Sequence, residues 1–300
     1  MSKREYILRY LTIIKKMRTS KTATFEEIKS YLERESEMTS YNLVISKRTF
    51  QRDLEEIRSL FNIDIQFDFS QKVYYIEMEA DQAEVYNRML ESFDLFNALN
   101  MASGIQSYVF FDKRKALGTE NFYSLLHAIK NRLTLSLQYQ KFYEDKPDQK
   151  KLQPYALKES QNRWYLIAKD LKDNITKTFG LDRITNVELT GPKFNIHEQI
   201  NISAMFKDSF GVIKGEGQPA HIVLTCDHKQ GRYVKSFPLH DSQKITENKE
   251  GFKIELDLHV THDLLMELMK YGNKLKILKP LSLQKTISIM FKESLSFYKV

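Results

Sequence analysis

The chain has 300 residues, of which 42% are hydrophobic and 28% are charged, a composition typical of soluble globular proteins with two or three domains. It has no apolar run near the roughly 20 residues that cross a bilayer and no apolar signal core, so we expect a cytoplasmic protein without membrane contact. A single cysteine, Cys226, excludes an intramolecular disulfide.

The net charge of +7 suggests an anionic partner, and the distribution of the basic residues indicates which region would bind it. Residues 1–21 contain seven Lys or Arg and only one acid, Glu5. A second acid-free cluster consists of Lys47, Arg48 and Arg52. Both clusters lie near the N-terminus, which makes that region the candidate nucleic-acid interface.

Three helices are predicted before residue 62. Residues 3–18 have apolar side chains at helical spacing, and a second helix starts near Thr24, which forms a capping-box pattern with Glu27. Ser46 is placed to cap a third helix over residues 47–61.

Two short runs rich in β-branched and aromatic residues follow, at residues 63–67 and 73–77. They predict a β-hairpin. Three helices followed by a hairpin is the order of a winged helix.

The third predicted helix is amphipathic. Its apolar stripe consists of Phe50, Leu54, Ile57 and Phe61, which leaves Arg48, Gln51, Arg52 and Glu55 on the opposite face. Arginine pairs with guanine and glutamine with adenine in a DNA major groove. Any solvated helix face carries similar residues, so the pattern alone leaves both interpretations open.

Residues 46–54, with Ile63, Ile65 and Tyr74, resemble the DeoR-type winged helix-turn-helix over residues 3–77. The resemblance implies that Lys47, Arg48, Thr49, Gln51 and Arg52 face double-stranded DNA and that Lys72, at the hairpin tip, contacts a phosphate. Asp53 is expected to pair with an arginine or to support the scaffold.

Residues 79–132 predict a helical linker, with helices at 81–103 and 120–133. Both are too hydrophobic for a free linker. They either pack on the neighbouring domains or form a dimer interface, which a reader of palindromic sites needs.

The only tryptophan lies in a predicted strand at residues 163–170. Alternation places Trp164, Leu166 and Ala168 on an apolar face, and Arg163, Tyr165, Ile167 and Lys169 on a mixed face. A tyrosine hydroxyl between two cations suits a nucleotide or polyanion pocket, but an ordinary half-buried strand shows the same pattern.

Tyr139, residues 150–157, residues 163–166 and residues 179–184 resemble the WYL domain in order and spacing, over residues 133–193. The resemblance implies an Sm-like β-barrel that binds a nucleic-acid or nucleotide effector. The implied effector residues are Tyr139, Lys150, Tyr155, Tyr165, Lys169, Asp182 and Arg183. The chain departs from the family where Lys150 and Gly180 stand in place of arginines.

After a connector at residues 194–217, strands are predicted at 220–226, 251–260 and 275–280, with helices at 261–271 and 281–297. Residues 240–245 and 277–280, with Gly251 and Gly272, resemble the C-terminal extension that often follows WYL domains. The resemblance implies a ferredoxin-like α/β sandwich at residues 218–300 that helps the family to dimerise.

Catalytic and metal-binding patterns are weak. Neither the pair His259 and His262 nor the pair Cys226 and His228 has the two further ligands that zinc requires, and there is no phosphate-binding glycine loop or nucleophile elbow. We therefore expect no enzyme, no metal and no cofactor.

The sequence thus predicts an α+β, multidomain protein, with a winged helix-turn-helix at residues 1–78, the linker, the WYL domain, the connector and the C-terminal extension. The predicted function is a sequence-specific transcriptional regulator, a homodimeric repressor under effector control. The alternatives are a single-stranded nucleic-acid or RNA sensor, or an accessory protein whose winged helix contacts protein.

Overall fold

The computed structural model describes residues 3–39, 41–76, 88–92, 95, 117–195 and 201–298. The chain divides into two compact units, Met1–Phe111 and Asp112–Val300.

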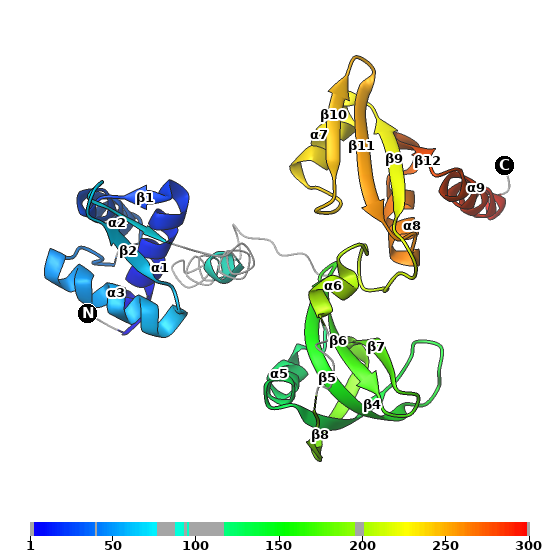
Figure 1. Ribbon diagram of the computed structural model, residues 1–300, viewed down its shortest axis with the longest axis horizontal. Coiled ribbons are helices and arrows are strands. Elements are labelled where there is room, and N and C mark those ends of the chain that lie inside the picture. The colour runs from blue at the N-terminus through cyan, green and yellow to red at the C-terminus, as the bar shows by residue number, and fades with distance from the viewer. Residues whose placement is uncertain are drawn as a thin grey trace. The chain divides into compact units, whose positions relative to one another are not determined.

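The first unit combines three helices with a small antiparallel sheet (Figure 1). Its helices are α1 (Lys3–Ser20), α2 (Phe25–Thr39) and α3 (Lys47–Phe61), and its strands are β1 (Thr22–Ala23), β2 (Ile65–Asp68) and β3 (Val73–Ile76). The strands pair in the order β1-β3-β2. The predicted helices and hairpin are confirmed, whereas β1 was missed because two residues are too few to show a period.

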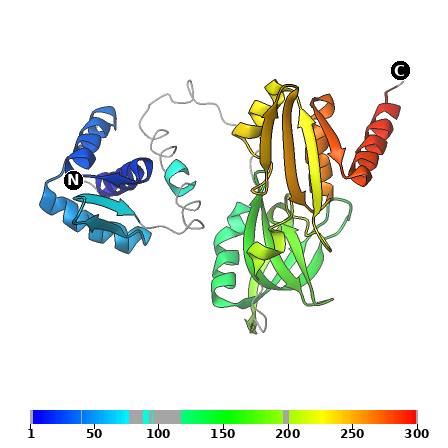
Figure 2. The ribbon, with the colours of Figure 1, turned by 45° about the horizontal axis from the view of Figure 1, so that its top comes forward.

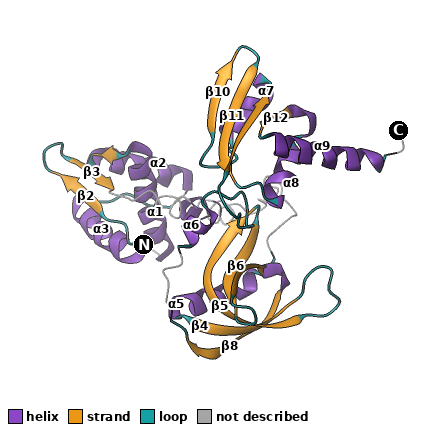
Figure 3. Ribbon diagram, turned by 45° about the vertical axis from the view of Figure 1, so that its right-hand side comes forward, coloured by secondary structure: helices purple, strands orange, loops and turns teal. Residues whose placement is uncertain are grey.

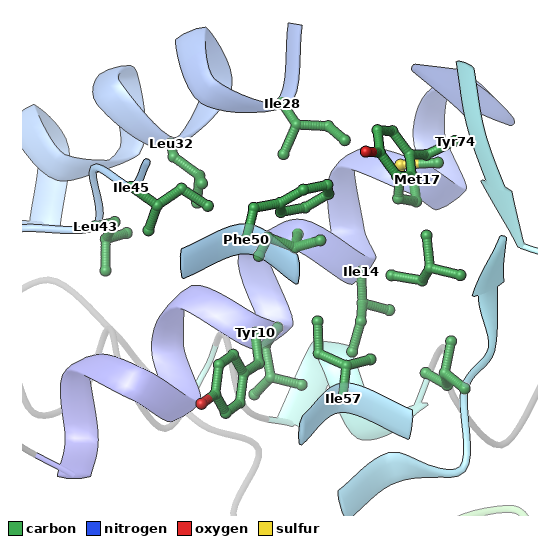
Figure 4. Packing of buried hydrophobic residues seen from close by; sticks show 14 of the residues in the cluster. Tyr10, Ile14, Met17, Ile28, Leu32, Leu43, Ile45, Phe50, Ile57 and Tyr74 are labelled. Atoms are coloured by element: carbon green, nitrogen blue, oxygen red, sulfur yellow. The ribbon is translucent and has the colours of Figure 1, made fainter. Parts of the chain in front are cut away.

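One hydrophobic core joins all three helices to the hairpin. Figure 4 shows Phe50 and Ile57 of α3 among side chains of α1 and α2. Phe50 is fully buried, and its ring meets Tyr74 of β3 edge-on at 4.9 Å between ring centroids. Burial of such a side chain contributes about 1.5–3 kcal/mol, so this contact fixes α3 against the hairpin.

The predicted linker helix at 81–103 lies largely outside the described residues, as does Glu77 of the predicted hairpin. Residues 88–92 and 95 are helical, and Leu90 belongs to the core of the first unit. The described part of this helix therefore packs on its own domain.

The second unit begins with a five-stranded antiparallel sheet, of order β7-β6-β5-β4-β8. Figure 3 shows α5 lying against this sheet. The elements are the short helix η2 (Thr119–Asn121), α5 (Phe122–Asn131), β4 (Leu133–Tyr139), β5 (Asp148–Ser160), β6 (Arg163–Asp170), β7 (Ile175–Gly180), η3 (Leu181–Arg183) and β8 (Ile184–Lys193). This sheet occupies the region of the expected WYL domain.

Strand β6 is buried on both faces over residues 166–168. Leu166 and Ala168 are fully buried in the sheet's core, and Trp164 meets Phe122 of α5 edge-on at 4.9 Å, which confirms the predicted apolar face. Ile167, on the predicted mixed face, is also fully buried. That face is therefore covered by another part of the chain.

The C-terminal module has a four-stranded antiparallel sheet of order β10-β11-β9-β12 (Figure 2). After α6 (Ile202–Phe206) the elements are β9 (Ala220–Cys226), α7 (His228–Ser236), β10 (Lys244–Asn248), β11 (Gly251–Leu258), α8 (His262–Lys270), the short helix η4 (Gly272–Lys274), β12 (Leu275–Lys279) and α9 (Leu281–Ser296). Side chains of α7, α8 and α9 join one core with the sheet. Cys226 packs in that core, as its place in an alternating strand predicts.

Two elements of this module were missed by the sequence prediction, α7 and β10. Helix α7 contains Gly231, which disfavours a helix prediction, and β10 has Ile245 as its only aliphatic residue. Yet Gly231 is required, because a Cβ atom there would lie 2.1 Å from the ring of Phe252. The close approach of α7 to β11 thus depends on a residue that weakens the helix signal.

Candidate nucleic-acid interface and effector site

Helix α3 presents the predicted DNA-facing residues on a well-anchored scaffold. The Ser46 hydroxyl accepts a hydrogen bond from the backbone N–H of Thr49 at 3.2 Å, so the helix begins at Lys47 as predicted. Lys47, Arg48 and Arg52 are exposed, and none of them forms an ion pair with a residue that the structure describes. These three cations are therefore free to meet an anion.

Two of the predicted contacts are partly engaged inside the protein. The Thr49 hydroxyl lies 3.0 Å from the Ser46 hydroxyl, and the side-chain amide of Gln51 donates to the Tyr74 hydroxyl at 3.3 Å. Gln51 therefore links the helix to strand β3, and reading a base would require that hydrogen bond to be shared or exchanged.

A buried ion pair ties α3 to α1. Arg9 donates to both carboxylate oxygens of Asp53, at 2.7 and 2.8 Å, and both side chains are fully buried. The guanidinium also lies near the rings of Tyr6 and Tyr10, at 5.0 and 5.8 Å. Asp53 thus pairs with an arginine as expected, and Arg9 of the basic N-terminal cluster is structural.

The hairpin tip carries Lys72, which is exposed and has a positive φ of 56°. Asp68 closes this turn by accepting hydrogen bonds from Ser70 and Gln71, and these bonds hold the pKa of Asp68 below its usual value. Phe69 beside it is 85% exposed, a feature that the sequence prediction did not single out. A cation and an aromatic ring therefore project together from a tight turn.

The seven predicted effector residues do not share one surface. Strand pairing places Tyr165 opposite Lys158 and Gly180, and Lys169 opposite Gln153, on one face of the sheet. Lys150 pairs with Leu137 and Tyr139 pairs with Asp148, among residues of the opposite, core face. Tyr155 lies at the bulge between Pro154 and Ala156, with its ring 6.0 Å from that of Phe194.

One group of these residues does gather, around Asp182. The Asp182 carboxylate accepts hydrogen bonds from Arg183 and from Arg163, each at 3.4 Å. Asp182 therefore orients both guanidiniums. Arg163 was not among the predicted site residues, although its place on the mixed face of the strand was the available signal.

Arg183 is further held by aromatic rings. Its guanidinium lies 5.4 Å from the ring centroid of Tyr139 and 4.8 Å from that of Phe142, which is 69% exposed. A Cβ atom at Gly180 would lie 2.4 Å from an Arg183 nitrogen. The space beside Gly180 is thus filled by the side chain of Arg183.

Tyr139 and Tyr165 lie close to this group. Burial raises the pKa of the Tyr139 hydroxyl, which accepts a hydrogen bond from the Gly180 N–H at 3.4 Å. Burial also raises the pKa of Tyr165, and the positive charges of Arg163 and Arg183 partly offset that effect. Tyr165 therefore lies near both guanidiniums, whereas Tyr139 lies near that of Arg183.

Lys150 belongs to a separate cluster. Its Nζ atom lies 2.7 Å from Asp148 and 3.6 Å from Asp170, while Lys177 pairs with Asp170 at 2.9 Å and with Asp173. Burial alone would raise the pKa of Asp170, but hydrogen bonds from the Lys172 N–H and from Lys177 outweigh it and hold that pKa low. The charge of Lys150 is consequently already matched by carboxylates.

The connector covers the face that carries Tyr165. The Thr178 hydroxyl donates to the carbonyl oxygen of Val212 at 3.3 Å, and Lys158 lies over the ring of Phe206 at 5.3 Å. The N–H groups of Val212 and Ile213 donate in turn to one Asp263 oxygen of α8, at 2.8 and 3.2 Å. Connector residues 206–213 thus join the five-stranded sheet to the C-terminal module.

Within the described ranges, no group of three or more His, Cys, Asp or Glu residues is arranged to hold a metal ion. No described helix combines the length and the apolar character that a membrane span requires.

Comparison with known proteins gives one family match. The family model of the WYL domain matches residues 120–189, a stretch that includes α5 as well as the five-stranded sheet. None of the curated proteins matches the chain.

Among solved structures, proteasome accessory factor B/C (PafBC) of Arthrobacter aurescens aligns with 99% of this chain and 48% of its own length, at 14% identity and a TM-score of 0.37. A CRISPR Cas-related protein aligns with 61% of this chain and 53% of its own, at 11% identity and a TM-score of 0.41. The chain therefore spans about half the length of either structure, and similarity at this level says nothing about what it binds.

Proposed function

Because residues 120–189 form a WYL domain, we propose that this protein is a transcriptional regulator that binds double-stranded DNA sequence-specifically. We further propose that the protein acts as a homodimer and represses transcription. Residues 1–78 serve as the winged helix-turn-helix, the barrel-like WYL domain takes a nucleic-acid or nucleotide effector, and the C-terminal module is a ferredoxin-like sandwich.

The free cations of α3 carry the proposal. Lys47, Arg48 and Arg52 are exposed without a described carboxylate partner, on a helix fixed by the Phe50 contact and by the buried Arg9–Asp53 pair. A rigid helix with unpaired guanidiniums near its N-terminus suits base edges in a major groove, where each good bidentate contact contributes about 1–3 kcal/mol of discrimination. Lys72 would add a phosphate contact that positions the domain.

A titration of duplex DNA tests this function. The probe is the duplex just upstream of the protein's own gene, compared with a shuffled duplex of the same composition across a salt series. Phosphate-dominated binding falls steeply with salt, whereas base discrimination persists. Protection of a palindrome whose half-sites lie about one or two helical turns apart supports the proposal. Equal, salt-labile binding to both duplexes contradicts it.

For the effector, the group around Asp182 is the best-supported site. Arg163, Arg183 and Tyr165 offer two guanidiniums and a hydroxyl, which suit a phosphate. The connector offers a route for coupling, because the carbonyl oxygen of Val212 accepts from Thr178 on this face while the N–H of the same residue donates to Asp263 of the C-terminal module. An effector can shift the protein only if it binds two arrangements of these contacts with different affinity.

A second candidate function is binding of single-stranded nucleic acid as the main activity. Phe142 and Tyr143 are 69% and 88% exposed, and the guanidinium of Arg183 lies over Phe142. Exposed rings beside a cation suit stacked bases, each worth about 1–3 kcal/mol. Tight binding of oligothymidylate together with no duplex discrimination would favour this function over the regulator.

A further inference from the structure

A groove runs between the edge strand β12 and the C-terminal helix α9. It is open to solvent and has a volume of about 400 Å³. Its apolar walls are formed by Leu275, Ile277, Ile287, Phe291 and Leu295. Neither the predicted DNA face nor the candidate effector site includes any of these residues.

Two of the apolar side chains that line the groove are exposed. Phe291 and Leu295 of α9 are 37% and 61% exposed, whereas Ile277 and Ile287 are only 7% and 6% exposed and belong to the core of the module. Isolated apolar side chains on a surface are ordinary, but a contiguous set beside a groove marks an interaction surface. The described part of the chain leaves this face of α9 without a covering element.

Lysines border the groove on both sides. Lys276 of β12 and Lys292 of α9 line it, both are exposed, and neither forms an ion pair with a described residue. On the sheet of the same module, by contrast, Lys253 pairs with Glu255 at 2.8 Å. The groove is therefore apolar at its centre and positively charged at its rim.

Two features decide what kind of occupant fits. The side-chain amide of Gln284 donates to the carbonyl oxygen of Ile277 at 3.2 Å, so α9 already occupies part of the free edge of β12 and opposes the addition of a further strand. A second copy of the same groove would bring lysines against lysines, and facing like charges are unfavourable. A helix with an apolar stripe and acidic flanks meets neither obstacle.

We propose that this groove is a docking site for an acidic amphipathic helix of a partner protein. Apolar side chains of the partner pack on Phe291 and Leu295, and its carboxylates pair with Lys276 and Lys292. This is the helix-in-groove mode of recognition, in which the apolar anchors supply affinity and the charges supply selectivity. The proposal is independent of DNA binding and of the effector.

The test uses the full-length protein and two labelled amphipathic peptides with the same leucine stripe, one flanked by glutamates and the other by lysines. Fluorescence anisotropy should show binding of the glutamate peptide and much weaker binding of the lysine peptide. Lys276→Glu with Lys292→Glu should lower the affinity for the glutamate peptide at least about tenfold, and a tenfold loss corresponds to about 1.4 kcal/mol of binding free energy.

The matched control is Lys229→Glu with Lys235→Glu, which makes the same change of charge on exposed residues of α7. It should leave peptide binding unchanged. Equal binding of both peptides, or equal effects of the two double variants, would overturn the proposal.

The remaining candidate occupant is a second copy of the chain, and sedimentation velocity distinguishes it from the proposed partner helix. If Leu295→Glu converts a dimer to a monomer while the glutamate peptide fails to bind, a second copy covers the groove and the proposal is wrong. If the peptide binds without any change in the oligomeric state, the acidic partner is supported.

Discussion

The exposed face of α3 and the group around Asp182 both display arginines, yet their charges stand in opposite situations. Arg48 and Arg52 have no described carboxylate partner, whereas Arg163 and Arg183 share Asp182. An anion that binds to α3 gains the full electrostatic attraction of these guanidiniums, because no described carboxylate competes for them. An anion that meets Arg183 must compete with a carboxylate already in place, so its net gain is smaller. The first arrangement suits constant DNA affinity, and the second suits a reversible effector.

The largest expected effect concerns the scaffold behind α3. Asp53→Ala leaves the fully buried Arg9 without its partner, and breaking a buried pair in this way costs about 3–5 kcal/mol. Denaturant unfolding of the first unit should show a loss of that size. The double variant Arg9→Met with Asp53→Leu should recover much of it, because both charges are then removed. A loss below about 1 kcal/mol for Asp53→Ala would mean that the pair does not anchor the helix.

The next effect concerns the paired arginines. Asp182→Asn removes the carboxylate between Arg163 and Arg183, so oligothymidylate should bind more tightly, by up to about 1 kcal/mol because the pairs are partly exposed. Glu188→Gln, an exposed acid on β8, is the control and should have no effect. Unchanged or weaker binding of the Asp182 variant would show that its arginines do not contact the anion.

A smaller effect is expected at the connector. Thr178→Val removes the hydrogen bond to Val212, worth about 0.5–1.5 kcal/mol, and should speed hydrogen exchange of residues 206–213. Thr176→Val is the matched control, because Thr176 lies on the same face of β7 and has no hydrogen bond to a described side chain or backbone group beyond the sheet. Equal exchange in both variants would remove Thr178 from the coupling route.

The smallest effect is the pH dependence of the Asp170 cluster. The pKa of Asp170 lies below its ordinary value of 3.8 in the folded protein, so the stabilisation is present above that value and is lost as the pH falls through the lowered pKa. The pKa of Lys177 is raised above 10.5, because its aspartate partners outweigh burial, so its contribution is lost only as the pH rises through that raised value. Acid unfolding of Asp170→Asn should show a shallower pH dependence than that of the unaltered protein, and an identical profile would contradict this assignment.

Local signals account for the parts of the structure that were predicted. The capping box at Thr24 is present, since the Thr24 N–H donates to Glu27 at 2.7 Å and the Glu27 N–H donates to the Thr24 hydroxyl at 3.3 Å. The cap at Ser46 likewise marks the start of α3. Each of these depends on residues three positions apart, which a sequence pattern can register.

Non-local contacts account for most of what was missed at the site. An arginine partner was expected for Asp53, but which arginine was not, because Arg9 lies 44 positions away. Lys150 meets Asp170 only because β5 pairs with β6. Ile167 is fully buried on the face where its cross-strand neighbour Thr178 bonds to Val212, a connector residue that follows in the chain after two more strands. Alternation identified which face Tyr165 shares with Arg163, but it could not reveal what lies on top of that face.

The central claim is that α3 reads DNA with its unpaired arginines. The most direct measurement is operator affinity, with and without a shuffled competitor, for Arg48→Ala with Arg52→Ala. The control is Arg58→Ala on the same helix, where the arginine is also exposed but lies 3.8 Å from Asp64. We expect the double variant to lose about 1–3 kcal/mol of operator-binding free energy for each base contact, and the control variant to lose little. Unchanged specific binding of the double variant would contradict the claim.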